Sequence, residues 1–154
     1  MHNWTAWDAS LSWSFGLIAI TITIHIVGIG SIANAVARFR HKLVDSRRPY
    51  LTGTPTAIAL LVIVALGLAV LHGVECFVWA LAYVHLNAFS SAADATLYSV
   101  DSMTTRGSSG LTAVREWRMM GAAEAGDGML LFGTSTAFLF LVMTRLWKTD
   151  LEAR

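Results

Sequence analysis

Three long apolar runs dominate the chain. They cover roughly residues 11–37, 55–86 and 117–147, and shorter polar stretches separate them. Each run exceeds the roughly 20 apolar residues that a helix needs to cross a hydrocarbon core of about 30 Å. Thr and Ile alternate over residues 20–24, as they would in a strand, but the length of that run and its lack of turn signals favour a helix. The pattern therefore predicts an all-α membrane protein with three spanning helices.

The composition agrees with membrane insertion. Of 154 residues, 55% are hydrophobic and 14% are charged, whereas soluble domains carry about 25% charged residues. The net charge of +1 and the lack of a basic tract interleaved with aromatic residues argue against a nucleic-acid partner. Cys76 is the single cysteine, which excludes an internal disulfide and a multi-cysteine metal site. We therefore expect the chain to be embedded in membrane lipid.

The basic residues predict an orientation. Residues 38–48 hold five of the eleven Lys and Arg residues, and residues 145–154 hold three more. Because Lys and Arg accumulate in cytoplasmic loops, we expect the N-terminus outside and the C-terminus in the cytoplasm of a multi-pass inner (cytoplasmic) membrane protein. The first run lacks the basic n-region of a cleaved signal peptide and is interpreted as a retained span. The expected division is an N-terminal helix and basic loop (1–54) followed by a second module (55–154).

The stretch between the second and third runs does not fit a simple three-span protein. Residues 91–104 form a short helix candidate, and residues 104–111 are small, polar and rich in Gly, Ser and Thr. A short helix, an irregular loop and then a spanning helix is the order of a re-entrant pore loop, which membranes tolerate where protein buries it or water lines it. An ordinary extracellular loop with an amphipathic piece has the same pattern. Both interpretations stay open on pattern alone.

Several short motifs carry a family resemblance, and they extend over about half of the chain. They are His72-Gly-Val-Glu75, Trp79-Ala-Leu-Ala-Tyr83, Ala88-Phe89, Leu97-Tyr98-Ser99, Thr104-Thr105, Gly107, Trp117-Arg118, Ala123-Glu124, residues 128–137 and Arg145-Leu-Trp147. In order and spacing they resemble the pore module of small prokaryotic potassium-channel-like proteins of the two-transmembrane, ion channel 2 type. The resemblance implies a potassium-channel-type pore module: an outer helix, a re-entrant pore helix with a filter loop, and an inner helix, assembled as a tetramer. The first helix would be an extra peripheral span.

The expected selectivity filter departs from the family pattern. Potassium-selective members carry Thr-(Val/Leu/Ile)-Gly-(Tyr/Phe)-Gly-Asp, and their rings of backbone carbonyls replace the water shell of the ion. Here Thr105, Arg106, Gly107, Ser108, Ser109 and Gly110 correspond to that pattern, and Thr104 precedes them in the expected filter. Gly107 keeps the first position that favours positive φ, but Ser109 replaces the second, Ser108 removes the aromatic ring and Gly110 removes the Asp. Loss or weakening of potassium selectivity is therefore expected.

Arg106 needs a partner if it points behind the filter, because an unpaired buried guanidinium is unfavourable. Asp101, five residues earlier near the end of the short helix, is the expected partner in an ion pair. Two alternatives stay open. Four Arg106 side chains could line the mouth of an anion pore, or Arg106 could be a solvated loop residue.

Acidic and histidine side chains within apolar runs are candidates for function. His72 and Glu75, spaced i, i+3, share one helix face and are expected to support the filter by contacting the short helix or the first helix around His25. Structural polar contact and proton sensing by His72 are the alternatives, and no metal site is expected because no third ligand of suitable spacing is evident.

Two acids of the third run follow the same i, i+3 spacing. Glu124 is expected to brace the short helix or the filter loop. Asp127 either contributes to a ring of four carboxylates lining the pore below the filter, or faces a neighbouring helix and is hydrogen-bonded there. Gly128 and Gly133 are the gating candidates, with close helix contact as the alternative for Gly128.

These features predict a pore-forming subunit that passes monovalent cations, with potassium as a candidate ion and no cofactor. The alternatives are a non-conducting interaction subunit, which would assemble with an intact paralogue, and an anion pore. No G-x-S-x-G, H-E-x-x-H or phosphate-binding glycine loop is present, so an enzyme is not expected.

Overall fold

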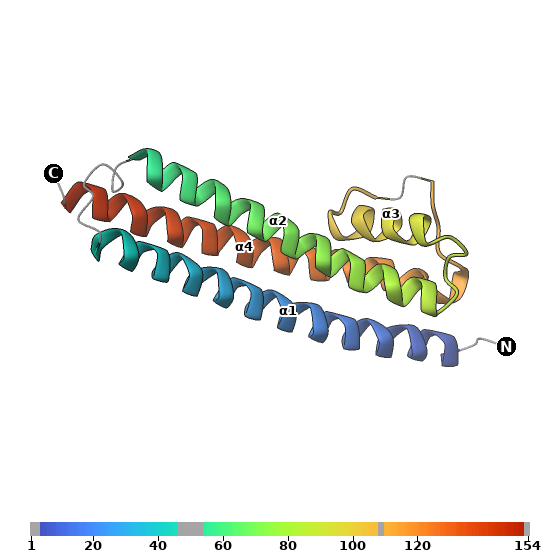
Figure 1. Cartoon of the computed structure of the whole chain (residues 1–154). Coiled ribbons are helices and arrows are strands. Elements are labelled where there is room, and N and C mark those ends of the chain that lie inside the picture. Colours follow the sequence, from blue (N-terminus) through green and yellow to red (C-terminus); the bar gives the residue numbers. More distant parts are fainter. Residues whose placement is uncertain (1–3, 46–53, 108–109, 153–154) are drawn as a thin grey trace. The chain divides into compact units, whose positions relative to one another are not determined.

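The computed structural model describes residues 4–45, 54–107 and 110–152. Within these ranges the protein is all α, with four α-helices and one short 3-10 helix (Figure 1). In chain order they are α1 (Trp4–Asp45), α2 (Thr54–His85), α3 (Ala92–Met103), η2 (Arg115–Trp117) and α4 (Arg118–Glu152). The all-α prediction is confirmed, and so is the short helix between the second and third apolar runs.

Three stretches are long and apolar enough to cross a membrane. They are Asp8–Lys42, Thr54–His85 and Arg115–Trp147, of 35, 32 and 33 residues. They cover the three predicted apolar runs, apart from residue 86, and extend beyond most of their ends. Pro55 lies in the first turn of α2, where its missing N–H leaves no helical hydrogen bond unmade. A multi-pass membrane protein is indicated.

The chain forms two compact units, each with its own core. The first contains residues 1–25 and 72–132, and the second contains residues 26–71 and 133–154. In the second unit, Leu60, Val64 and Leu68 recur every four residues on α2 and pack with Val142 and Leu146 of α4. The buried residues form one stripe of a helix that is apolar on its exposed faces as well, as a membrane-spanning helix is. The predicted division of the chain into modules 1–54 and 55–154 was based on the sequence pattern and stays a prediction.

The first unit differs because its inward-facing positions on α1 are largely polar. Ser10, Ser14, Thr21 and His25 are all buried and recur at helical spacing. Ser14 donates to the carbonyl of residue 10, so its hydroxyl keeps a hydrogen bond on an apolar helix. Small and polar residues at helix contacts are typical of membrane proteins, because they allow close approach and cross-helix hydrogen bonds. The apolar part of this core includes Trp79, Tyr83, Met103, Met120 and Leu131.

Turn chemistry delimits α3. Asn87 (φ 53°) ends α2 in a left-handed conformation, with the Asn87 and Ala88 N–H groups donating to the carbonyls of Val84 and Tyr83. This is a Schellman motif, in which asparagine is a common alternative to glycine. Ser91 then caps α3 by accepting from the Asp94 N–H at 3.3 Å. The predicted helix over 91–104 is thus observed as Ala92–Met103.

Candidate functional site

The candidate site is a set of buried acids in the first unit, each held by polar or charged side chains. Glu75 lies on α2, Asp101 on α3, and Glu124 and Asp127 on α4, and all four are almost completely buried. A buried carboxyl group is unfavourable unless hydrogen bonds or charges satisfy it. The partners of these four acids therefore define how the helices are fixed.

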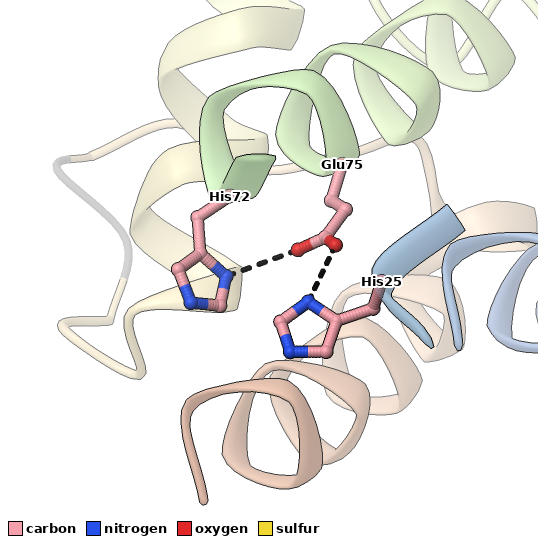
Figure 2. Close-up of side chains that lie close together, drawn as sticks. All are labelled: His25, His72 and Glu75. Carbon is pink, nitrogen blue, oxygen red and sulfur yellow. Dashed lines mark hydrogen bonds and ion pairs between the residues drawn. The ribbon is translucent and has the colours of Figure 1, made fainter. Parts of the chain in front are cut away.

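Glu75 lies between two histidines (Figure 2). Its Oε1 is 2.7 Å from Nδ1 of His25 on α1, and its Oε2 is 3.0 Å from Nδ1 of His72, one turn earlier on α2. The His72 ring stacks on Phe132 of α4, with ring centroids 4.1 Å apart. The expected contact of His72 and Glu75 around His25 is confirmed.

The same three side chains overturn one expectation. His25, His72 and Glu75 each offer a potential metal-ligating atom, and these atoms lie within 4.8 Å of one another. The statement that no third ligand is near was therefore wrong. It relied on spacing along the sequence, whereas the third donor comes from α1, which is 50 residues away in sequence.

Glu124 connects three helices. Tyr83 of α2 donates to its Oε2 at 2.7 Å, and Ser99 of α3 makes a short hydrogen bond with its Oε1. The Ser99 hydroxyl also lies 2.8 Å from the carbonyl oxygen of Cys76. Because a hydroxyl carries one hydrogen, both Ser99 contacts are full hydrogen bonds when Glu124 is protonated and donates to Ser99. The expected bracing of the short helix by Glu124 is observed.

Asp127 is held by the other two long helices. Its Oδ2 accepts from the Thr21 hydroxyl of α1 at 2.6 Å and from the Trp79 indole of α2 at 3.2 Å. Its Oδ1 is also buried and accepts no hydrogen bond from the described residues. The side chain is enclosed within a single chain, so the predicted carboxylate ring lining a pore is not supported. The alternative is observed: Asp127 faces neighbouring helices and is hydrogen-bonded.

The C-terminus of α3 ends in a second Schellman motif. The Thr105 N–H donates to the Ser102 carbonyl at 2.9 Å, and the Arg106 N–H donates to the Asp101 carbonyl at 3.0 Å. Thr105 occupies the left-handed position with φ 54°. A β-branched residue is rare there, because its Cβ crowds the backbone. The backbone is therefore strained at Thr105, where the expected filter loop begins, and this strain was not predicted from the sequence.

Asp101 and Arg106 form the predicted ion pair, between Nη2 of Arg106 and Oδ1 of Asp101. The pair spans the Schellman motif, since Asp101 and Arg106 are also the residues joined by its longer backbone hydrogen bond. The expected burial of Arg106 is not found within one chain: its side chain is 62% exposed, against 2% for Asp101. The carboxylate is fixed in the core and the guanidinium reaches outward from it.

The expected filter residues are described in part. Thr104, Thr105, Arg106 and Gly107 are exposed within one chain, as is Gly110. Gly107 and Gly110 have φ values of 83° and 91°, so the predicted positive φ at Gly107 is confirmed. Ser108 and Ser109 lie outside the described residues, and the predictions made for them stay predictions.

The two gating candidates have different surroundings. A Cβ added at Gly128 would collide with the backbone carbonyl of Met103, which ends α3. Close helix contact, the alternative proposed for Gly128, is therefore observed. Gly133 has no atom within 4 Å of the place where its Cβ would be, so its suggested role in gating stays a prediction.

Tyr98 is a further residue that sequence reasoning did not place at the site. Burial raises the pKa of its hydroxyl, and a hydrogen bond with Ser102 opposes part of the shift. Its hydroxyl approaches Gly121 of α4 closely enough to exclude a Cβ there. Tyr98 therefore adds a third contact through which α3 packs against its neighbours.

Comparisons of the chain with protein-family models, with curated proteins and with solved structures gave no match. The function of this protein is therefore inferred from the geometry above and from the motifs in the sequence.

Proposed function

We infer that this protein is a pore-forming subunit of a tetrameric, potassium-channel-like ion channel that conducts monovalent cations with weakened or lost potassium selectivity. In this proposal α2 is the outer helix, α3 the pore helix, residues 104–110 the filter loop and α4 the inner helix. The N-terminus lies outside and the C-terminus in the cytoplasm, in accordance with the basic residues at 38–48 and after α4.

The observation that carries the proposal is the depth at which α3 packs. Its Ser99 bonds to the Cys76 carbonyl, and Cys76 precedes the end of α2 at His85 by about 14 Å of helix. Its last residue, Met103, contacts Gly128, which follows the start of α4 at Arg118 by about 15 Å of helix. Both contacts lie within stretches that are long and apolar enough to cross a membrane, Thr54–His85 and Arg115–Trp147. This depth supports a re-entrant segment rather than a loop on the membrane surface.

The path of the chain supports the same interpretation. The Val114 N–H lies 3.5 Å from the Ala88 carbonyl, so the excursion over residues 88–114 begins and ends at one place. Between these points α3 leads towards Cys76 and Gly128, and the loop returns without helical structure in the described residues. Irregular backbone at such depth requires burial by protein or contact with water. Assembly around a central aqueous path provides both.

The ion pair argues against an anion pore. An anion pore would need free positive charge at the loop, whereas Asp101 contributes a negative charge beside each Arg106. The second candidate is a non-conducting subunit that retains the channel fold. The exposure of the Arg106 side chain favours it, since four such residues near an axis would repel cations.

Flux measurements on purified protein in liposomes test the proposal. Under separate potassium, sodium and chloride gradients we expect cation flux and no chloride flux. Gly107→Ala should abolish this flux because it places a Cβ at φ 83°. Gly126→Ala should retain it, because no atom lies within 4 Å of that site. Silence in every gradient from folded tetramers would favour the non-conducting subunit, and chloride flux would contradict the cation proposal.

A further inference from the structure

Two histidines and one glutamate converge in the first unit, and the proposed pore does not use them. Figure 2 shows the Glu75 carboxylate between the rings of His25 and His72, with both Nδ1 atoms directed at its oxygens. The donors come from two helices, α1 and α2, and belong to one chain. Two imidazoles and one carboxylate are the protein ligands of many zinc sites that keep one position open for water.

We propose that His25, His72 and Glu75 bind one divalent transition-metal ion per chain, of the type represented by Zn²⁺, and so link α1 to α2. Imidazole nitrogen is a preferred ligand of Zn²⁺ and its first-row neighbours, whereas Mg²⁺ and Ca²⁺ prefer oxygen. The donor set therefore excludes the two abundant hard cations as occupants.

The spacing of the donors fits such an ion after an adjustment. Around a tetrahedral Zn²⁺ with bonds of 2.0–2.1 Å, neighbouring donors lie about 3.3–3.4 Å apart. The two nitrogen–oxygen pairs here are 2.7 and 3.0 Å apart, and all the donors lie within 4.8 Å of one another. To hold the ion, the nitrogen–oxygen pairs would separate by about 0.3–0.7 Å, and a donor pair at the 4.8 Å limit would close by about 1.4 Å.

The chemistry of the change is balanced. A neutral imidazole that donates its Nδ1 hydrogen to Glu75 must carry that hydrogen on Nε2 before Nδ1 can bind a metal, and this change of tautomer releases no proton. Glu75 gives the ion one carboxylate ligand. Water would complete the coordination.

Burial holds the donors in place and leaves one route of entry. The side chains of His25 and Glu75 are 1% and 0% exposed, and that of His72 is 11% exposed. Stacking on Phe132 fixes the plane of the His72 ring. An ion would therefore enter beside His72 and meet donors that are already oriented, which reduces the entropy lost on binding.

The test is metal binding by the full-length protein, purified in detergent without a polyhistidine tag and treated with a chelator. Titration with Zn²⁺ should give one ion per chain, and excess Mg²⁺ should not displace it. Glu75→Gln keeps the size of the side chain but removes the charged ligand. It should weaken binding by more than roughly 100-fold, since even outer-shell partners of metal ligands contribute 10- to 100-fold.

His85→Asn is the matched control, because His85 lies on α2 near Trp13 and outside the cluster. It should bind Zn²⁺ as the unaltered protein does. Failure to retain Zn²⁺, or equal retention by Glu75→Gln, would overturn the proposal.

A second measurement needs no variant. X-ray absorption of the zinc-loaded protein should show only nitrogen and oxygen ligands at about 2.0–2.1 Å. A sulfur ligand would identify Cys76 in place of this donor set and would also overturn the proposal. Because the cluster lies within one chain, neither result depends on whether the protein conducts ions.

Discussion

Gly128→Ala probes the contact that sets the depth of α3. A Cβ at residue 128 would overlap the carbonyl group of Met103. This neighbour is backbone at the end of a helix, so it cannot rotate away as the tip of a flexible side chain can. To accept the methyl group, the C-terminus of α3 must move away from α4. Gly126→Ala is a matched control on the same helix, where no atom lies within 4 Å of the added carbon.

The magnitude follows from two opposing terms. Alanine is favoured over glycine inside a helix by about 0.5–1 kcal/mol, and this gain applies equally to both variants. Overpacking a well-packed contact typically costs about 1–3 kcal/mol, and it applies only at residue 128. Gly126→Ala should therefore be slightly stabilising. Gly128→Ala should be less stable than Gly126→Ala by about 1–3 kcal/mol.

Equilibrium unfolding in mixed micelles with increasing SDS, followed by tryptophan fluorescence, gives this difference. Hydrogen exchange of the α3 amides then shows where the loss lies, and faster exchange over residues 99–106 is expected for Gly128→Ala alone. Equal stability of the two variants, with α3 equally protected, would refute the contact at Gly128. A change in ion flux with unchanged stability would favour the hinge interpretation of that residue.

Three further predictions concern α3 and the loop that follows it. A double-mutant cycle of Asp101→Asn and Arg106→Gln should give a coupling energy of about 0.2–1 kcal/mol in SDS unfolding, because solvent screens the exposed guanidinium. Additive effects of the two substitutions would show that the ion pair does not contribute to stability. Thr105→Gly should stabilise the protein by about 1 kcal/mol, because it removes the strain of a threonine in the left-handed conformation. Asn87→Gly should have less effect, since asparagine tolerates that conformation. Equal effects of the two substitutions would contradict the strain at Thr105. Since burial raises the pKa of Tyr98, the unfolded chain ionises first and stability falls as the pH rises past about 10. Tyr98→Phe should lose less stability over that range, measured by unfolding at successive pH values.

The helices were predictable because they depend on local pattern. Three apolar runs of spanning length predicted the long helices, although α1 extends beyond its run at both ends, and the short segment 91–104 predicted α3. The Asp101–Arg106 pair was predictable for a related reason, since the two residues are only five apart, at the end of α3 and in the loop that follows it.

The rotation of each helix about its axis was not predictable in the same way. Asp127 faces Thr21 and Trp79 because of how α4 packs against two other helices, and nothing in its own sequence neighbourhood reports this. The polar stripe on α1 was the available signal. Thr21 and His25 are one turn apart in an apolar run, and such residues in a membrane helix generally face protein partners. The same stripe gives an independent reason for the predicted contact of His72 and Glu75 with His25.

The most direct test of the central claim is a set of distances between chains in a lipid bilayer. Thr112 is exposed just beyond the loop, so Thr112→Cys accepts a spin label, while the native Cys76 thiol is buried. Four chains around one axis predict two label-to-label distances, in the ratio of the diagonal of a square to its side. Pulsed electron resonance measures both. A single distance, or none, would contradict the fourfold arrangement and with it the proposed channel.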